Sequence, residues 1–292
     1  MGPEREITVV TMSAVTVEQP VFHPKAHIPS SLAGMVDVIA QLDQRVPARR
    51  LIMPMGKVEL ALFLEGSDIT EFYMGFDGLS NRGPRKEFSL LFSVANRPQV
   101  VAAKRINIML ALMSPAAAML IFGVPASELT NKSISPESLG IDMAPLQDEL
   151  NALPTFSARA RVLEQWLWRR LAAGPGNPGL FHVSKSLVAL FGDDRLIPDS
   201  QQVMDLTGYS RSHADRLAKQ WLGLTVEQYS ALQAYRRALR LLNEPLSLAE
   251  VAVRAGYFDQ AHFTRTFTRY SGITPGEYRR APQTGIDTLH VD

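Results

Sequence analysis

The sequence predicts an α+β protein, with a mainly β N-terminal domain that ends in helices and an all-α C-terminal domain. Three observations lead to this prediction: short apolar segments separated by turn residues up to about Met113, a Pro- and Gly-rich break at residues 172–179, and helical periodicity after that break. With 292 residues, 46% of them hydrophobic, the chain is long enough to bury the cores of two domains.

The first half of the chain has the pattern of strands followed by helices. LIMPM, VELALFL and FSLLFSV are short apolar runs separated by clusters of Gly, Asp, Asn and Pro, which favour turns. From Pro115 onward, PAAAMLIFG and MAPLQDELNAL predict short helices, and TFSARARVLEQWLWRRLAAG predicts a longer one with Thr155 as its N-cap. Trp166 and Trp168 on the longer helix favour packing against another domain or a second subunit.

One apolar segment, residues 106–124, is long enough to suggest a membrane span. In its middle, however, Ser114 and Pro115 have the pattern of an N-cap followed by Pro at the first position of a helix. We therefore expect a buried strand and a short helix, with a membrane-tethered protein as the alternative.

The clearest break in the chain is AAGPGNPG, residues 172–179, because two Pro and three Gly fit neither a helix interior nor a central strand. The expected parts are an N-terminal domain at residues 1–173, a linker at 174–183, a helical C-terminal domain at 184–282 and a flexible tail at 283–292.

The composition excludes several kinds of chemistry. The absence of cysteine rules out disulfides, thiolate metal sites and cysteine nucleophiles, and it fits a reducing cytoplasm. No GxSxG, HExxH, Walker or dinucleotide-binding motif is present. His23 and His27 are four apart, but Pro24 lies between them and no third ligand is near, so we expect no metal site. We expect no enzymatic activity and no cofactor, and a cytoplasmic location.

Two segments of the C-terminal half repeat each other. GYSRSHADRLAKQWLGLTVEQY, residues 208–229, aligns with GYFDQAHFTRTFTRYSGITPGEY, residues 256–278, when one extra residue is allowed in the second. A short helix that closes at a Gly precedes each segment, as VMDLTG and LAEVAVRAG. This is the pattern of a helix-turn-helix unit, which buries one face of its second helix and leaves the other face free for the major groove of DNA.

The helical periodicity assigns a buried and an exposed face to each second helix. Phe263, Phe267 and Tyr270 fall on one side of the later helix, at about 100° per residue. The inward residues of the earlier helix are Ala214, Leu217, Ala218 and Trp221. Between the units, TVEQYSALQAYRRALRLLNEP predicts one continuous helix, which would separate the units by about 34 Å if both enter successive major grooves.

Residues 185–282 resemble the DNA-binding domain of the AraC/XylS family of transcriptional regulators. SLAEVAVRAGYFDQAHFTRTF and the later GITPGEYRR match the family's second helix-turn-helix in residue type and spacing. The first unit departs from the family at Ala218, Val226 and Ala234, where Phe, Pro and Arg are usual. Less specifically, RRLIMPMGKVELALFLEG and SPAAAMLIFGVPASELTN resemble the N-terminal domain of one branch of the family, which implies small-molecule sensing or dimerisation.

The resemblance implies that outward residues near the start of each recognition helix contact bases, and others contact phosphate. Side-chain chemistry agrees for several, because Arg binds guanine with two bonds, Gln suits adenine, Asp accepts from cytosine and Ala contacts a thymine methyl. For His213 and His262, helix packing is an alternative role. The expected base contacts are Ser212, Asp215, Arg216, Gln260, Ala261, His262 and Arg265. The expected phosphate contacts are Arg211, Lys219, Arg236, Arg237, Arg269 and Arg279.

The sequence therefore predicts a sequence-specific transcriptional regulator of the AraC type, with both recognition helices in successive major grooves and with modulation through the N-terminal domain by a small molecule or by dimerisation. The expected partners are double-stranded promoter DNA and RNA polymerase, with a small-molecule effector and a homodimer left open. An architectural or constitutive DNA binder without an effector is the alternative. An alkyl-transfer enzyme fused to a DNA-binding module would need an acceptor thiol, which this chain lacks.

Overall fold

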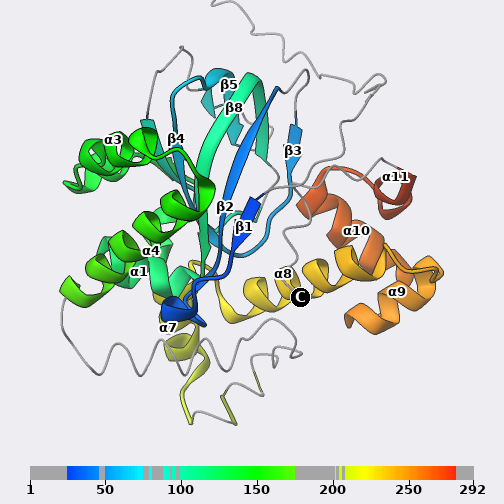
Figure 1. The fold of residues 1–292 in the computed structure, drawn as a ribbon. Helices are drawn as coiled ribbons and strands as arrows, with labels where there is room; N and C mark the ends of the chain where they lie inside the picture. The colour runs from blue at the N-terminus through cyan, green and yellow to red at the C-terminus, as the bar shows by residue number, and fades with distance from the viewer. Residues whose placement is uncertain are drawn as a thin grey trace, which may run out of the picture.

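The chain folds into an antiparallel β-sheet with helices packed on one face, followed by a helical region built around one long helix (Figure 1). The computed structural model describes residues 25–45, 50–74, 79–80, 88–92, 94–96, 99–174, 201, 204–205 and 208–280.

The sheet has nine strands in the described part of the chain, in the order β1-β2-β8-β4-β7-β9, with β3 and β5 also paired to β8 and β6 paired to β5. The strands are β1 (Lys25–His27), β2 (Val36–Arg45), β3 (Arg50–Ile52), β4 (Val58–Phe63), β5 (Asp68–Met74), β6 (Leu79–Ser80), β7 (Phe88–Phe92), β8 (Gln99–Met113) and β9 (Ser133–Ile134).

β8 is the central strand, because it pairs along its whole length. Its later half lies between β2 and β4, and its earlier half pairs with β3 and β5. All of these pairings are antiparallel. A strand flanked on both sides has its backbone donors and acceptors satisfied within the sheet, which suits the apolar run that the sequence places there.

The two faces of the sheet carry separate apolar clusters, because successive side chains of a strand point to opposite faces. Leu60 and Met109 belong to the cluster that also contains residues of the helices, whereas Ala61 and Leu110 belong to a smaller cluster on the opposite face. The helices on the first face include α1 (Pro115–Phe122) and α4 (Phe156–Ala173).

The apolar segment at residues 106–124 divides at Ser114, as expected. β8 ends at Met113, and the Ser114 side chain accepts a hydrogen bond from the Ala117 N–H at 3.2 Å to start α1. Gly123, with φ of 74°, closes this helix. Within the described ranges, no helix combines the length and the apolar character that a bilayer crossing needs.

The long helix α4 has the expected N-cap, since Thr155 accepts from the Ala158 N–H at 3.3 Å. Leu163 and Leu167 are buried. Of the two tryptophans, Trp166 packs on Phe122 of α1 with ring centroids 6.4 Å apart, within the N-terminal half of the chain. Trp168 is 52% exposed, so it does not pack on another domain of the described chain, and its packing against a second subunit stays a prediction. Trp168 comes two positions after Trp166, so its side chain is rotated by about 200° around the helix axis and points away from the packed face.

Four further short helices of the described chain lie between the strands of the sheet or between the strands and α4. They are η1 (Ser30–Leu32), α2 (Ala126–Leu129), η2 (Pro136–Leu139) and α3 (Ala144–Ala152). His27 of β1, half of the histidine pair considered for a metal, lies 2.7 Å from Glu164 of α4, and His23 lies outside the described residues.

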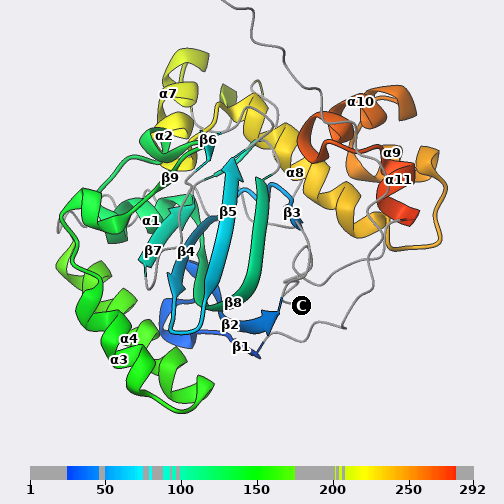
Figure 2. The ribbon, with the colours of Figure 1, turned by 90° about the horizontal axis from the view of Figure 1, so that it is seen from above.

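The C-terminal helices are arranged along α8. They are α7 (Arg211–Leu222), α8 (Val226–Leu241), α9 (Leu248–Ala255), α10 (Gln260–Ser271) and α11 (Pro275–Arg280). α7 and the start of α8 lie beside the N-terminal part, and α9, α10 and α11 gather at the far end of α8 (Figures 1 and 2). Most of the expected linker lies outside the described residues, so the domain boundaries stay predictions. Of the helix expected at VMDLTG, Met204 and Asp205 are helical, and Gly208, with φ of 69°, donates its N–H to the Met204 carbonyl at 2.8 Å.

Candidate nucleic-acid interface

The sequence repeat corresponds to two helices, α7 and α10, that begin and end in the same way. Ser210 and Asp259 are their N-caps, and each side chain accepts from the backbone N–H three residues later, at 3.4 and 2.6 Å. Gly223 and Gly272 are their C-caps, with φ of 80° and 77°. This left-handed conformation favours Gly, so the ends of both helices are fixed by local sequence.

Each of these helices buries one face, as the periodicity predicts. On α10, Phe263, Phe267 and Tyr270 are buried. Tyr235 of α8 packs on two of them, with ring centroids 5.1 Å from Phe267 and 5.0 Å from Tyr270. The corresponding buried residues of α7 are Ala214, Ala218 and Trp221.

The opposite face of α10 is exposed and polar. All of its expected base-contacting residues are exposed, namely Gln260, Ala261, His262 and Arg265. The Arg265 side chain has no hydrogen bond or ion pair to the residues that the structure describes. His262 touches the edge of Tyr257 with ring centroids 5.4 Å apart, so it contributes to packing at the start of the helix while remaining accessible.

The outward residues of α7 are partly engaged within the protein. Ser212 and Arg216 are exposed, and Arg216 donates to Nδ1 of His213 at 2.9 Å. Asp215 is half-buried and accepts from the Val226 N–H at 3.1 Å, so its carboxylate satisfies a donor in the first turn of α8. Sequence periodicity places Asp215 on the outward side but does not detect this bond to the next helix.

The expected phosphate contacts are mostly accessible. Lys219 and Arg269 are exposed, and Arg269 stacks over the Tyr270 ring at 5.1 Å. Arg279 donates from Nε to the Leu242 carbonyl at 3.3 Å, which ties α11 to the end of α8. Arg237 is half-buried. Arg211 is exposed and lies 3.5 Å from Glu227, an exposed pair that contributes little to stability.

Arg236 departs from its expected role, because it is only 7% exposed. Its Nη1 donates to Oε1 of the buried Gln233 at 3.0 Å. Leu232 and Gln233 on the same side of α8 face Gly56, in the turn between β3 and β4. The phosphate assignment of Arg236 is therefore contradicted: this side of α8 packs against the N-terminal part and does not face solvent.

The first unit is joined to the N-terminal part at the end of α7. The Thr130 hydroxyl lies 2.8 Å from the Gly223 carbonyl and 3.0 Å from the Ala126 carbonyl, so its proton bonds one or the other. A Cβ atom at Gly223 would come within 2.5 Å of the Thr130 Oγ1 and 3.1 Å of the Ala126 carbonyl. Only Gly fits this contact, which makes Gly223 both a helix cap and a point of close approach.

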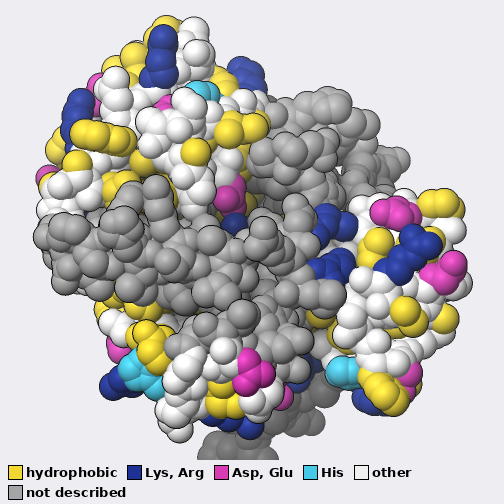
Figure 3. All heavy atoms as spheres, turned by 90° about the horizontal axis from the view of Figure 1, so that it is seen from below, with side chains coloured by type: hydrophobic (Ala, Val, Ile, Leu, Met, Phe, Trp, Pro, Cys, Tyr) yellow, Lys and Arg dark blue, Asp and Glu magenta, His cyan; other side chains and the backbone are white. Residues whose placement is uncertain are grey.

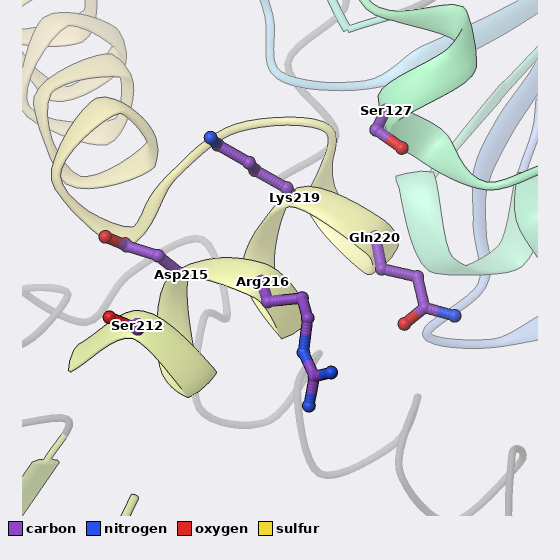
Figure 4. Close-up of a pocket in the computed structure, with 6 residues that line it drawn as sticks. All are labelled: Ser127, Ser212, Asp215, Arg216, Lys219 and Gln220. Carbon is purple, nitrogen blue, oxygen red and sulfur yellow. The ribbon is translucent and has the colours of Figure 1, made fainter. Parts of the chain in front are cut away.

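A shallow pocket of about 520 Å³ marks this junction (Figure 4). One wall is Ser127 of α2, and it stands across from Gln220 on α7. The other residues that line the pocket are Ser212, Asp215, Arg216 and Lys219. Four expected DNA-contacting residues of α7 therefore line a pocket whose remaining wall belongs to the N-terminal part.

Basic side chains are not concentrated in one large patch on the face drawn in Figure 3. The described Lys and Arg side chains there form small groups among acidic and apolar ones. The nearly balanced composition, with 30 Lys and Arg against 29 Asp and Glu, agrees with this distribution. Any attraction of DNA must therefore come from where the charges lie around α7 and α10 rather than from net charge.

The fold and the site together define a protein in which an N-terminal part that contains a β-sheet is followed by two helix-turn-helix units. A protein family described as helix-turn-helix domain matches residues 204–281. The multiple antibiotic resistance protein MarA of Escherichia coli (strain K12) is 34% identical over 89 residues, which cover 29% of this chain and 68% of MarA. The chain belongs to the AraC/XylS family of transcriptional regulators.

Other relatives match over the same region. The probable transcription factor PqrA of Proteus vulgaris is 31% identical over 78 residues, 26% of this chain and 64% of PqrA. The HTH-type transcriptional regulator GlxA of Rhizobium meliloti (strain 1021) is 37% identical over 84 residues, 28% of this chain and 26% of GlxA. The chain thus spans less than two thirds of each of these two relatives. Among solved structures, ToxT from Vibrio cholerae is similar with a TM-score of 0.45 and 10% identity, over 83% of this chain and 96% of ToxT.

Proposed function

We propose that this chain is a sequence-specific DNA-binding transcriptional regulator whose helices α7 and α10 enter successive major grooves. The observation that carries the proposal is the duplication: two helices with matching caps and matching buried faces each leave a polar ridge exposed, and α8 joins them. A recognition helix needs this combination of a fixed position and a free polar face.

Base contacts are proposed for the exposed ridge of α10 and for the outward residues of α7. Arg265 is the strongest candidate, because its exposed guanidinium has no partner among the described residues and can bind O6 and N7 of guanine together. Gln260 and Ala261 in the first turn suit adenine and a thymine methyl. The remaining proposed base contacts are His262, Ser212, Arg216 and Asp215, the last of which keeps one oxygen on Val226.

Phosphate contacts are proposed for the accessible basic residues that flank these ridges. A point charge near phosphate positions the protein and makes affinity depend on salt without selecting a sequence. The candidates are Arg211, Lys219, Arg237, Arg269 and Arg279.

Modulation through the N-terminal part belongs to the same proposal. Its support is the junction at Thr130 and Gly223, where α2 stands beside the outward residues of α7 (Figure 4). DNA that approaches α7 meets α2, so an effector or a second subunit that moved α2 would change access to the first recognition helix. RNA polymerase is the proposed partner of the promoter-bound protein.

The test begins with selection of double-stranded DNA from a random library by the full chain, followed by Arg265→Ala on the selected site. We expect Arg265→Ala to weaken specific binding by about 1–3 kcal/mol and to relax preference at one base pair. Arg254→Ala is the matched control, because Arg254 is an exposed arginine on α9 outside the proposed ridge. Unchanged preference at every base pair in Arg265→Ala would refute base contact by this residue.

Repeating the selection with and without candidate metabolites separates a regulator from an architectural binder. A regulator changes its DNA affinity when an effector binds the N-terminal part. Light scattering of the free and DNA-bound chain measures whether a dimer forms. Constant affinity across metabolites and assembly states would favour the constitutive binder.

A further inference from the structure

Phe258 is the described large hydrophobic residue with the greatest exposure, at 91%. Full burial of such a side chain stabilises a folded protein by about 1.5–3 kcal/mol, and the exposed Phe258 does not provide this stabilisation. Single exposed apolar residues are common, so exposure alone assigns no role. Its position in the second helix-turn-helix unit supplies the further argument.

The residues on both sides hold Phe258 outward. Tyr257 is buried and packs on Phe263 with ring centroids 5.2 Å apart. Asp259 caps α10 by accepting from the His262 N–H at 2.6 Å. Tyr257 is thus held in the core and Asp259 is held at the start of α10. The turn between α9 and α10 directs Phe258, which lies between them, away from the protein.

Phe258 is also the extra residue in the sequence repeat. In the first unit Tyr209 is followed directly by the N-cap Ser210, whereas in the second unit Phe258 stands between Tyr257 and the N-cap Asp259. The first unit forms the same capped helix without this residue. The turn therefore does not need a large apolar side chain at this position in order to fold.

In the proposed complex, this position lies at the end of α10 that approaches DNA. A recognition helix contacts base edges with its N-terminal residues, so the residue just before the N-cap lies beside that contact. Phe258 adjoins the exposed Gln260 and Ala261. A phenyl ring forms an apolar contact with the 5-methyl group of thymine, which projects into the major groove. Contact with DNA would also remove this ring from water.

We propose that Phe258 is a specificity-determining residue that contacts the 5-methyl group of one thymine at the edge of the base pairs bound by α10. This inference rests on the proposed DNA-binding function. DNA is the favoured occupant because the exposed Phe258 lies two residues before Gln260, the first residue of the exposed polar ridge formed by Gln260, Ala261 and Arg265. A protein partner is the competing occupant, and the experiment distinguishes the two.

The experiment uses the full chain and the DNA site selected by it from a random duplex library. Each thymine of the site is replaced in turn by deoxyuridine, which removes only the 5-methyl group. We expect one replacement at the α10 edge to weaken binding of the unchanged protein by about 3- to 10-fold. In Phe258→Ala that replacement has no effect, while the effects of all the others remain.

Two controls make the result specific to Phe258. Val253→Ala removes another exposed apolar side chain of the same unit, 70% exposed on α9, and is expected to keep the full thymine pattern. Thermal unfolding of Phe258→Ala is expected to match that of the unchanged chain, because the side chain is exposed.

The outcomes separate this inference from the proposed function. If the unchanged chain selects no sequence, the proposed function fails and this inference fails with it. If it selects a site but Phe258→Ala gives the same thymine pattern, or if the site has no thymine at the α10 edge, the thymine contact is refuted while the proposed function stands. If Phe258→Ala binds all duplexes normally but loses transcription activity, Phe258 belongs to a protein contact and the thymine contact is again overturned.

Discussion

Among the described carboxyl groups, that of Glu59 has the largest increase in pKa caused by loss of hydration. It lies on β4, opposite Phe92 of β7 and Leu112 of β8. On the same face of the sheet the next residues along the strand are Ala61 and Phe63, both buried. Glu59 is half-buried, and the loss of water around its carboxyl group among these apolar residues raises the pKa of Glu59 to about 7, because it disfavours the charged form.

This environment predicts a dependence of stability on pH. The folded chain binds the Glu59 proton more strongly than the unfolded chain, whose pKa is near 4.5, so the folded form gains most below that value. We expect the Glu59 contribution to the free energy of unfolding to fall as the pH rises from about 4.5 to about 7, by about 2–3 kcal/mol at most.

Glu59→Gln tests this dependence, because Gln has no titrating proton. We expect the variant to be more stable than the unchanged chain at pH 8 and to lose the Glu59 part of the slope in urea unfolding across this range. Glu65→Gln is the control, since Glu65 is exposed. An identical pH profile for Glu59→Gln and the unchanged chain would contradict the raised pKa of Glu59.

At the scale of secondary-structure elements, the helix-turn-helix units depend on caps that the sequence specifies locally. Ser247 with Glu250, and Thr274 with Glu277, form reciprocal bonds at the starts of α9 and α11. Backbone hydrogen bonds from Ser247 and Thr274 are the main reason that the pKa of each of these carboxyl groups lies below its ordinary value. Acidic residues in a first turn also suit the helix dipole.

The N-cap of α10 provides a prediction at this scale. Asp259→Ala removes the side-chain acceptor of the His262 N–H, so we expect the free energy of unfolding to fall by about 1 kcal/mol. Hydrogen exchange should also speed up in the first turn of α10, where the proposed base contacts lie. The measurement is urea unfolding combined with hydrogen-exchange mass spectrometry.

Asp259→Ser is the matched control for this cap. Serine supplies an oxygen at the same position and is itself a strong N-cap, as Ser210 is on α7. We expect it to keep most of the stability that Asp259→Ala loses. If the Ala and Ser variants unfolded alike, the cap would not explain the effect of the substitution.

At the scale of the whole molecule, the two helix-turn-helix units have different surroundings. The first unit contacts the N-terminal part through Thr130 and Gly223, and α8 contacts it through Leu232 beside Gly56. The second unit lies at the far end of α8 (Figures 1 and 2). The N-terminal part therefore has direct contacts with both α7 and α8.

Thr130→Val tests whether this contact restrains α7. Valine keeps the shape of threonine but can donate to neither the Gly223 nor the Ala126 carbonyl, so it removes the Thr130 hydrogen bond, worth about 0.5–1.5 kcal/mol, including its share to Gly223. If docking competes with DNA for α7, the variant should bind the selected site about 2- to 10-fold more tightly, as a fluorescence anisotropy titration would measure.

Ser127→Ala is the control, because Ser127 lines the same pocket without a described hydrogen bond of its own. We expect it to leave affinity unchanged. Equal DNA affinity for Thr130→Val and the unchanged chain would show that the junction does not restrain the first recognition helix.

The sequence by itself determined the features that depend on nearby residues. The predicted caps at Ser114 and Thr155 involve partners three residues away, and the buried faces of α7 and α10 follow from helical spacing. The repeat was visible for the same reason, since each unit carries its own signals. These interactions need no knowledge of where distant segments lie.

Only the tertiary structure decided how distant segments meet. Thr130 and Gly223 are 93 positions apart, and no local pattern predicts their hydrogen bond. Arg236 is a different case: it lies between Leu232 and Leu239 at helical spacing, so periodicity alone places it on the buried side of α8, whereas the phosphate role came from the family resemblance. Packing between remote surfaces depends on shape and burial summed over many side chains, whereas caps and helical faces are set within one or two turns of the chain.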